Sequence, residues 1–156
     1  MSSGAAEEPI RVVLADDHAF VREVVKAIVG TMRGVEVIAE AQDGCELLKV
    51  LEKFMPDVVI TDLSMPRMDG LDAIVQIRRK YPLLPVLAFT MNEDVQLVTR
   101  AIAAGASGYV MKNCHPQELE QAIRSGARFG SYFSPCIAQA LLQLEPDQER
   151  ADGAPA

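Results

Sequence analysis

Apolar residues recur along the chain in five short runs, and the stretches between the runs have helical periodicity. Three of the runs, at residues 10–15, 57–62 and 85–90, are almost continuously apolar and rich in Val, Ile and Leu. This composition is typical of parallel strands that are covered on both faces. The run at 35–41 alternates more regularly, which favours a place near the edge of a sheet, and the last run covers 107–112.

The stretches between these runs place apolar residues three or four positions apart, as one face of an α-helix requires. In the first stretch Phe20, Val24 and Ile28 recur at every fourth position, with three further valines beside them. Helices are predicted in this way at 18–32, 45–55, 70–80, 94–104 and 116–129. Strand and helix alternate five times, and this alternation predicts an α/β domain with a parallel sheet.

One more helix is predicted at residues 134–145, beyond the last repeat. Ser134 is suited to cap its N-terminus, and Pro135 is suited to its first turn. The apolar stripe of this helix consists of Ile137, Leu141, Leu142 and Leu144. Because so short a helix is not stable alone in water, we expect it to pack on its own domain or on another copy of the chain.

These patterns divide the chain into four expected segments. Residues 1–8 form a disordered N-terminus, and residues 9–130 form one domain. Residues 131–145 carry the extra helix, and residues 146–156 form a linker or a disordered tail because they contain almost no apolar bulk.

Composition excludes several classes of protein. The 156 residues are 49% hydrophobic and 24% charged, which is ordinary for a soluble globular protein. The net charge of −7 argues against this chain alone binding DNA or an anionic membrane. No signal peptide or membrane-spanning run is present, and Cys45, Cys114 and Cys136 lack the spacing of a zinc site. Reduced thiols and a cytoplasmic location are therefore expected.

Reactive side chains stand at the ends of four predicted strands. The first strand is followed by Asp16 and Asp17 and the third by Asp62, while Thr90 closes the fourth and Lys112 the fifth. Each has an ordinary explanation when taken alone: Asp17 could cap the next helix, for example. However, the carboxyl ends of parallel strands lie at one edge of the sheet, where open α/β folds bind their ligands.

Three clustered carboxylates favour a hard cation, because they would otherwise repel one another. Only oxygen ligands are offered, and this selects an ion such as Mg²⁺. His18 follows the acid pair, but we interpret it as a first-turn helix residue at the rim rather than a metal ligand. A carboxylate can attack phosphorus to form an aspartyl phosphate, and a cation with a Lys is the expected apparatus for such a transfer.

The segments that carry these residues resemble a known family. "LADDH" (14–18), "VVITDLSMPRMDG" (58–70), "LAFT" (87–90) and "GASGYVMK" (105–112) are similar, in order and spacing, to the receiver domain of two-component response regulators. The resemblance covers about residues 9–130. It implies the flavodoxin-like, doubly wound fold: a five-stranded parallel sheet in the order 2-1-3-4-5 with helices on both faces, here followed by the extra C-terminal helix.

The resemblance also implies roles for individual residues. Asp62 corresponds to the phosphoacceptor, Asp17 to the direct Mg²⁺ ligand and Asp16 to the acid that helps to hold the ion. Ser64 corresponds to the position whose backbone carbonyl binds the metal.

Three further residues correspond to the parts of the family that read the phosphate. Lys112 matches the lysine that pairs with the phosphate, and Thr90 matches the hydroxyl switch residue. Tyr109 matches the aromatic residue that turns inward when the hydroxyl moves.

The implied function is a phosphorylation-dependent signalling switch that receives phosphate from a sensor histidine kinase. It is not an enzyme in the ordinary sense, although self-catalysed phosphoryl transfer and slow dephosphorylation are expected. "DDH" and "GSYFSPCIAQALL" resemble the NarL/FixJ subfamily, whose members end in a LuxR-type DNA-binding helix-turn-helix. No such domain lies within these residues, so we expect transcription to be regulated through a domain outside this chain, with no DNA binding by this chain alone. Homodimers are expected through residues 94–129 or through the extra helix.

Three alternatives stay open. The chain could be a natural stand-alone receiver that acts by protein–protein contact. It could be a receiver-like module that is never phosphorylated, although it keeps the acids, the Thr and the Lys. It could also be a phosphatase of the haloacid dehalogenase class, but that class needs an acid two residues after the nucleophile, where this chain has Ser64.

Overall fold

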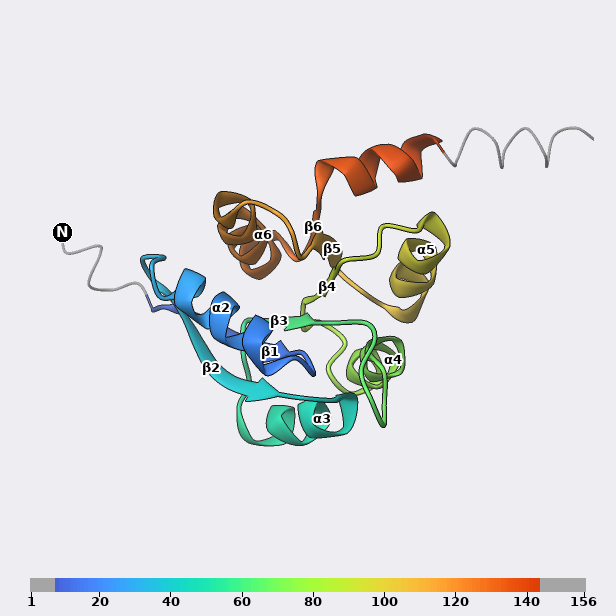
Figure 1. Cartoon of the computed structure of the whole chain (residues 1–156). Helices are drawn as coiled ribbons and strands as arrows, with labels where there is room; N and C mark the ends of the chain where they lie inside the picture. The colour runs from blue at the N-terminus through green and yellow to red at the C-terminus, as the bar shows by residue number, and fades with distance from the viewer. Residues whose placement is uncertain (1–7, 144–156) are drawn as a thin grey trace, which may run out of the picture.

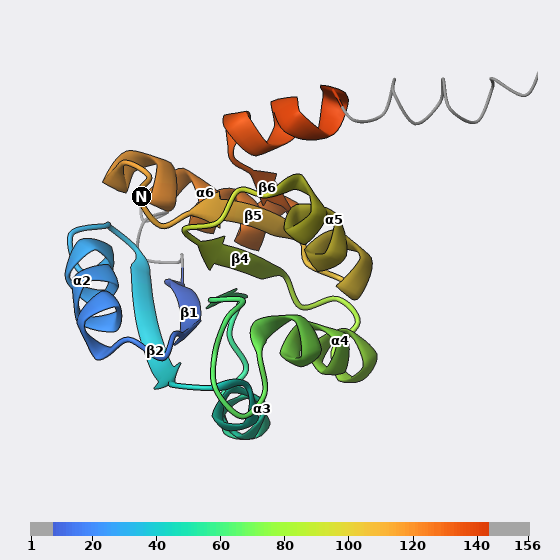
Figure 2. The same ribbon diagram turned by 45° about the vertical axis from the view of Figure 1, so that its right-hand side comes forward.

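A parallel sheet lies between two layers of helices in the computed structural model, which describes residues 8–143 (Figures 1 and 2). The strands are β1 (Ile10–Ala15), β2 (Val35–Ala41), β3 (Val58–Thr61), β4 (Val86–Thr90), β5 (Gly108–Met111) and β6 (Tyr132–Phe133). Their order is β2-β1-β3-β4-β5-β6. The predicted order of the first five strands is confirmed, as is the edge position of β2. The two-residue β6 was not predicted.

The helices agree closely with the periodic stretches. They are α2 (Ala19–Val29), α3 (Gly44–Lys53), α4 (Gly70–Lys80), α5 (Val95–Ala104) and α6 (Pro116–Phe129). A further helix, which we call the C-terminal helix, covers residues 135–143 of the described chain. It follows β6 directly and lies beyond that edge of the sheet (Figures 1 and 2).

The two faces of the sheet carry separate cores, because side chains alternate along each strand. On β1, Val13 and Ala15 belong to a core that α3, α4 and α5 cover. Val12 and Leu14 belong to the opposite core, which α2 and α6 cover. Both faces are therefore apolar at every central strand, as the continuous runs predict.

Helix caps are mostly acidic, but the one nearest the acid pair is not. Asp43, Asp69 and Asp94 each accept a hydrogen bond from a backbone N–H in the first turn of the helix that follows. Helix α2 begins after His18, whose side chain makes no capping bond. The suggestion that Asp17 caps this helix is therefore wrong.

Several side chains depart from the sequence-based expectation. Phe20 was placed on the buried stripe of α2, yet it is 79% exposed, because the inner face of that helix is formed by Val25 and Val29. Leu142 is 66% exposed, so it does not broaden the buried stripe of the C-terminal helix. Ser134 precedes this helix, but its buried hydroxyl has no hydrogen-bond partner among the described residues and does not cap it.

Arg78 lies in the last turn of α4 and is bonded to backbone carbonyls of two other segments. Its guanidinium donates hydrogen bonds to the carbonyl oxygens of Gly105 and Pro82, at 2.7 and 2.8 Å. Burial lowers the pKa of this guanidinium from its ordinary value. Arg78 therefore ties α4 to the turn that follows α5.

Some predictions fall outside the part of the chain that the structure describes. These are the disorder of residues 1–7, the packing of Leu144, the end of the extra helix and the tail at 146–156. Among residues 8–143, no helix is both long and apolar enough to cross a membrane.

Candidate functional site

Asp62 follows the last residue of β3 and is held at the carboxyl-terminal edge of the sheet. Its N–H donates to the carbonyl of Ala15 on β1, with 2.9 Å between N and O. The loop after it folds closely behind it: a Cβ added to Gly70 would lie 2.0 Å from the Asp62 carbonyl oxygen. Only glycine fits there, and the side chain of Asp62 is thereby kept at the mouth of the site, 5% exposed.

Carboxylates from two neighbouring strands converge at this point. Asp16, Asp17, His18 and Asp62 each place a potential ligand atom within 4.8 Å of the others. Asp16 is fully buried, whereas the side chain of Asp17 is 30% exposed. The expected acidic cluster therefore exists as a three-dimensional arrangement.

Lys112 lies between two of these acids. Its Nζ is 2.7 Å from Oδ2 of Asp16 and 2.9 Å from Oδ2 of Asp62. Burial lowers the pKa of this ammonium, but the contacts with the carboxylates of Asp16 and Asp62 raise it more, so its pKa lies above the ordinary value. Lys112 is thus a fixed positive charge in the site at neutral pH.

The acidic cluster fits a hard divalent cation. One ammonium faces three carboxylates, so negative charge remains in excess at the mouth of the site. The Asp16 Oδ2 atom is buried, and its ion pair with Lys112 does not have the geometry of a hydrogen bond. Mg²⁺ binds through one or two carboxylates while keeping several waters, and Asp16, Asp17 and Asp62 offer carboxylate oxygens within 4.8 Å of one another.

His18 lies closer to the acids than its expected position at the rim suggested. Its Nδ1 is 3.2 Å from Oδ1 of Asp16 and from Oδ1 of Asp17. The ring is 64% exposed, and it belongs to the N-terminal end of α2. Adjacency in the sequence was the only available signal for this contact.

A second ion pair supports the loop after Asp62, and the sequence did not reveal it. Arg67 donates from Nε and Nη2 to Oδ2 of Asp43, at 3.0 and 2.7 Å. Arg67 has φ of +67°, a conformation that few side chains adopt, and the N–H of Gly44 donates to the carbonyl of Met68. These contacts fasten the loop to the start of α3.

Thr90 and Tyr109 are connected through Asn92. The N–H of Asn92 lies 3.3 Å from Oγ1 of Thr90, and the hydroxyl of Tyr109 donates to the Asn92 carbonyl at 2.5 Å. Tyr109 is fully buried, so its ring is in the inward position. Burial, with the charges of Asp94 and Asp62, raises the pKa of its hydroxyl to about 12.

The structure brings together most of the predicted site residues. One cluster contains Asp16, Asp17, Asp62 and Lys112. Thr90 of β4 and Tyr109 of β5 form a separate pair that is linked through the backbone of Asn92. Ser64 is exposed, and its N–H lies 3.4 Å from Oδ1 of Asp62. The roles implied for these residues, including metal binding by the Ser64 carbonyl, stay predictions.

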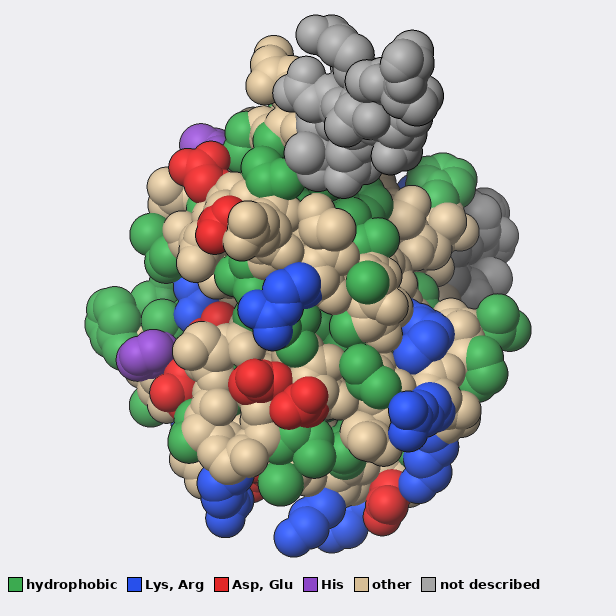
Figure 3. Space-filling view, turned by 90° about the vertical axis from the view of Figure 1, so that its right-hand side faces the viewer, with side chains coloured by type: hydrophobic (Ala, Val, Ile, Leu, Met, Phe, Trp, Pro, Cys, Tyr) green, Lys and Arg blue, Asp and Glu red, His purple; other side chains and the backbone are tan. Residues whose placement is uncertain are grey.

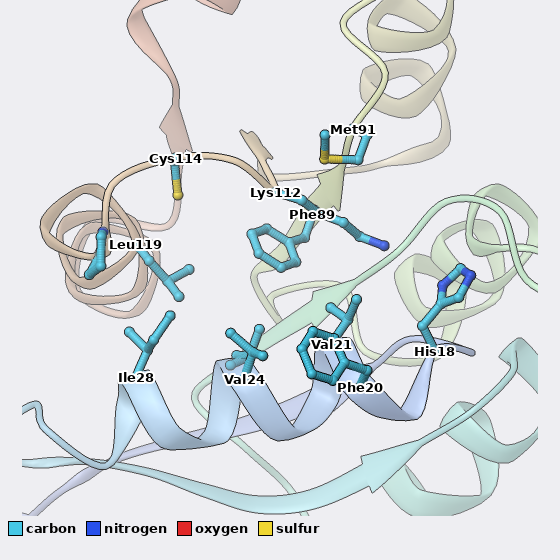
Figure 4. Close-up of a pocket in the computed structure, with 12 residues that line it drawn as sticks. His18, Phe20, Val21, Val24, Ile28, Phe89, Met91, Lys112, Cys114 and Leu119 are labelled. Carbon is cyan, nitrogen blue, oxygen red and sulfur yellow. The ribbon is translucent and has the colours of Figure 1, made fainter.

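An apolar groove of about 370 Å³ opens beside the cluster, between α2 and α6. Figure 4 shows Val24 and Ile28 of α2 facing Leu119 of α6, with Phe89 between the helices and Lys112 extending toward His18. Figure 3 views the molecule from the right-hand side of Figure 1. On that face acidic and basic side chains both lie near the centre, and further Lys and Arg side chains lie along the right and lower rim.

The sequence matches the response regulator receiver domain family over residues 12–124. The chain belongs to this family.

Two curated relatives and one solved structure show how far the similarity of this receiver extends. It is 37% identical over 146 residues to the response regulator GacA of Pseudomonas viridiflava, covering 94% of this chain and 68% of that protein. It is 33% identical to the transcriptional regulatory protein DegU of Brevibacillus brevis, covering 92% of this chain but only 61% of that protein. A LuxR-family two-component response regulator from Aurantimonas sp. SI85-9A1 superimposes with a TM-score of 0.83 at 35% identity, over 88% of this chain and 99% of the other.

Proposed function

We propose that this receiver accepts a phosphoryl group on Asp62 and thereby acts as a signalling switch. The observation that carries the proposal is the position of Lys112, whose ammonium contacts Asp16 and Asp62 at one mouth that also holds Asp17. No purely structural need explains three carboxylates and a buried lysine at the end of the most apolar strands.

The proposed reaction transfers the phosphoryl group from a phosphohistidine of a sensor kinase. A carboxylate oxygen of Asp62 forms the new O–P bond, the P–N bond breaks, and the released imidazole takes up a proton. Mg²⁺, held by Asp16, Asp17, Asp62 and the Ser64 carbonyl, would neutralise charge on the phosphoryl oxygens. Lys112 is placed to pair with the phosphate once Asp62 is modified, because its Nζ already lies 2.9 Å from Asp62 Oδ2.

We propose that Thr90 is the residue that responds first to the phosphate. An aspartyl phosphate brings nearly two negative charges and new acceptor oxygens. The Thr90 hydroxyl now accepts a hydrogen bond from Asn92, and in the proposed switch it turns to donate to the phosphate. Tyr109 follows because its own hydroxyl is bonded to the Asn92 carbonyl.

The proposed output is regulation of transcription. The relatives named above are a response regulator and a transcriptional regulatory protein, and this chain spans 61–68% of their length. We propose that the phosphorylated receiver controls a DNA-binding domain of the LuxR type, in the cytoplasm, where response regulators generally act.

The first test is labelling with acetyl phosphate. We expect the intact mass to rise by one phosphoryl group in the presence of Mg²⁺, and to stay unchanged when EDTA is added. Asp62→Asn, which keeps the size of the side chain, should show no increase. Equal labelling of the parent and of Asp62→Asn would contradict the assignment of the acceptor.

A further inference from the structure

The C-terminal segment is attached directly to the strand that carries Tyr109. Strand β6 pairs with β5 in parallel, with Tyr109 opposite Phe133. The N–H of Ser134 donates to the carbonyl of Tyr109 at 3.0 Å, and the N–H of Tyr132 donates to the carbonyl of Ser107 at 3.3 Å. The backbone of the proposed switch residue is therefore the anchor of this segment.

The contact between the two strands is very close at Gly108. A Cβ at this position would lie 2.0 Å from the carbonyl oxygen of Tyr132 and 2.7 Å from a methyl group of Leu87. A side chain at Gly108 would push β6 away from the sheet. The glycine allows the backbone of the C-terminal segment to lie directly on β5.

Ile137 attaches the C-terminal helix to the core formed by β5 and α5. Its side chain is 1% exposed and belongs to the core cluster that contains Tyr109 together with Val98 and Ala101 of α5. Phe133 and Leu141 pack against this cluster from the same segment. A helix of this length needs such packing to persist, so its position depends on the surface that Tyr109 helps to form.

A continuous set of contacts leads from the switch hydroxyl to this helix. Thr90 accepts a hydrogen bond from Asn92, and the carbonyl of Asn92 accepts one from the Tyr109 hydroxyl. The carbonyl of Tyr109 holds Ser134, and its side chain shares a core with Ile137. Tyr109 and Ile137 belong to one closely packed core, so a displacement of the Tyr109 ring after a change at Thr90 would act on the packing of the C-terminal helix.

We propose that residues 132–143 form a docking element whose attachment to β5 and α5 is coupled to the phosphorylation state of Asp62 through Tyr109. The coupling rests on the proposed function, since it needs a phosphoryl group on Asp62. In the structure the Tyr109 ring is inward and the Ile137 side chain is buried. A phosphoryl group on Asp62 that keeps the Tyr109 ring inward therefore strengthens the attachment of residues 132–143 to the domain. By reciprocity, a docked segment strengthens binding of a phosphoryl analogue.

The test uses the full chain with Mg²⁺ and beryllofluoride as the phosphoryl analogue. Ile137→Ser removes the buried anchor, and Leu142→Ser is the matched control, because Leu142 is on the same helix and 66% exposed. We expect Ile137→Ser to raise the dissociation constant for beryllofluoride at least threefold, measured by ¹⁹F NMR titration, and Leu142→Ser to leave it unchanged. Ile137→Val keeps most of the side chain, so its dissociation constant for beryllofluoride should lie between those of the two serine variants. This variant preserves the test if Ile137→Ser does not fold.

Hydrogen exchange in the parent gives an independent measurement. Amides of residues 132–137 should exchange more slowly when beryllofluoride is bound. The proposal is overturned if beryllofluoride binds to the parent without slowing these amides, or if Ile137→Ser frees them while the dissociation constant stays at the parental value. If the parent does not bind beryllofluoride at all, the proposed function fails and this inference fails with it.

Discussion

The two faces of the sheet are covered to different degrees. On one face α3, α4 and α5 bury a continuous core, and Ile137 of the C-terminal helix completes it. On the other face α2 and α6 bury a smaller core but leave a groove between them, with Phe20 and Met91 at 79% and 61% exposure. The groove is lined in part by His18 and Lys112, so it opens beside the acidic cluster.

The different covering of the two faces corresponds to two requirements of a switch: a path that transmits the change and a surface that admits the phosphoryl donor. A rearrangement that begins at Thr90 can reach a distant surface only through closely packed side chains, and Tyr109 lies in the closed core. In the proposed function, a phosphoryl donor reaches Asp62 from outside, and the loosely covered face adjoins Lys112, which pairs with Asp62. For the proposed function, the closed face is therefore suited to transmit a change from Thr90, and the open face is suited to admit the phosphoryl donor.

The largest effect is expected from a cavity in the closed core. Ile74 of α4 is fully buried there, and Ile74→Ala should reduce the free energy of unfolding by about 2–5 kcal/mol. Urea denaturation followed by circular dichroism measures this loss. A loss below about 1 kcal/mol would mean that this face relaxes around the cavity, and the contrast between the faces would disappear.

An intermediate and pH-dependent effect is expected at Asp43. The hydrogen bond from the Glu46 N–H, together with the ion pair to Arg67, holds the pKa of this carboxyl below its ordinary value of 3.8. A lowered carboxyl pKa stabilises the fold above the unfolded value, and this stabilisation is lost as the pH falls through the folded value. Asp43→Asn should therefore be less stable than the parent at pH 7, and the difference should shrink below pH 3.8.

Arg67→Gly removes the other partner of the ion pair with Asp43. It removes the guanidinium but relieves the positive φ of 67°. We expect a smaller loss of stability at pH 7 than from Asp43→Asn, measured by the same urea titration. A difference between Asp43→Asn and the parent that does not change between pH 7 and pH 3 would show that the charge of Asp43 contributes nothing.

The smallest effect is expected on the open face. Phe20→Ala removes a ring that is 79% exposed, so the free energy of unfolding should change by less than about 0.5 kcal/mol. Labelling by acetyl phosphate should also stay at the parental rate, because Phe20 makes no hydrogen bond or ion pair with the acidic cluster. A large loss of stability would show that this face is as closed as the other.

The sequence by itself determined the order of elements and the location of the site. Apolar periodicity is a local property, so the first five strands and the helices after them could be predicted within a few residues. The convergence of Asp16, Asp17, Asp62 and Lys112 was also predictable, because parallel strands end at one edge of the sheet.

Only the tertiary structure decided the remaining features. Strand β6 has two residues and carries no periodicity, and it forms because β5 has a free edge at Gly108. Phe20 and Val25 look alike as apolar helix residues, yet only the helix rotation against the sheet exposes the first and buries the second. The pairing of Arg67 with Asp43 joins residues 24 positions apart, and Ile137 packs into the core cluster that also contains Tyr109. Such contacts depend on distances in space, which local sequence patterns do not contain.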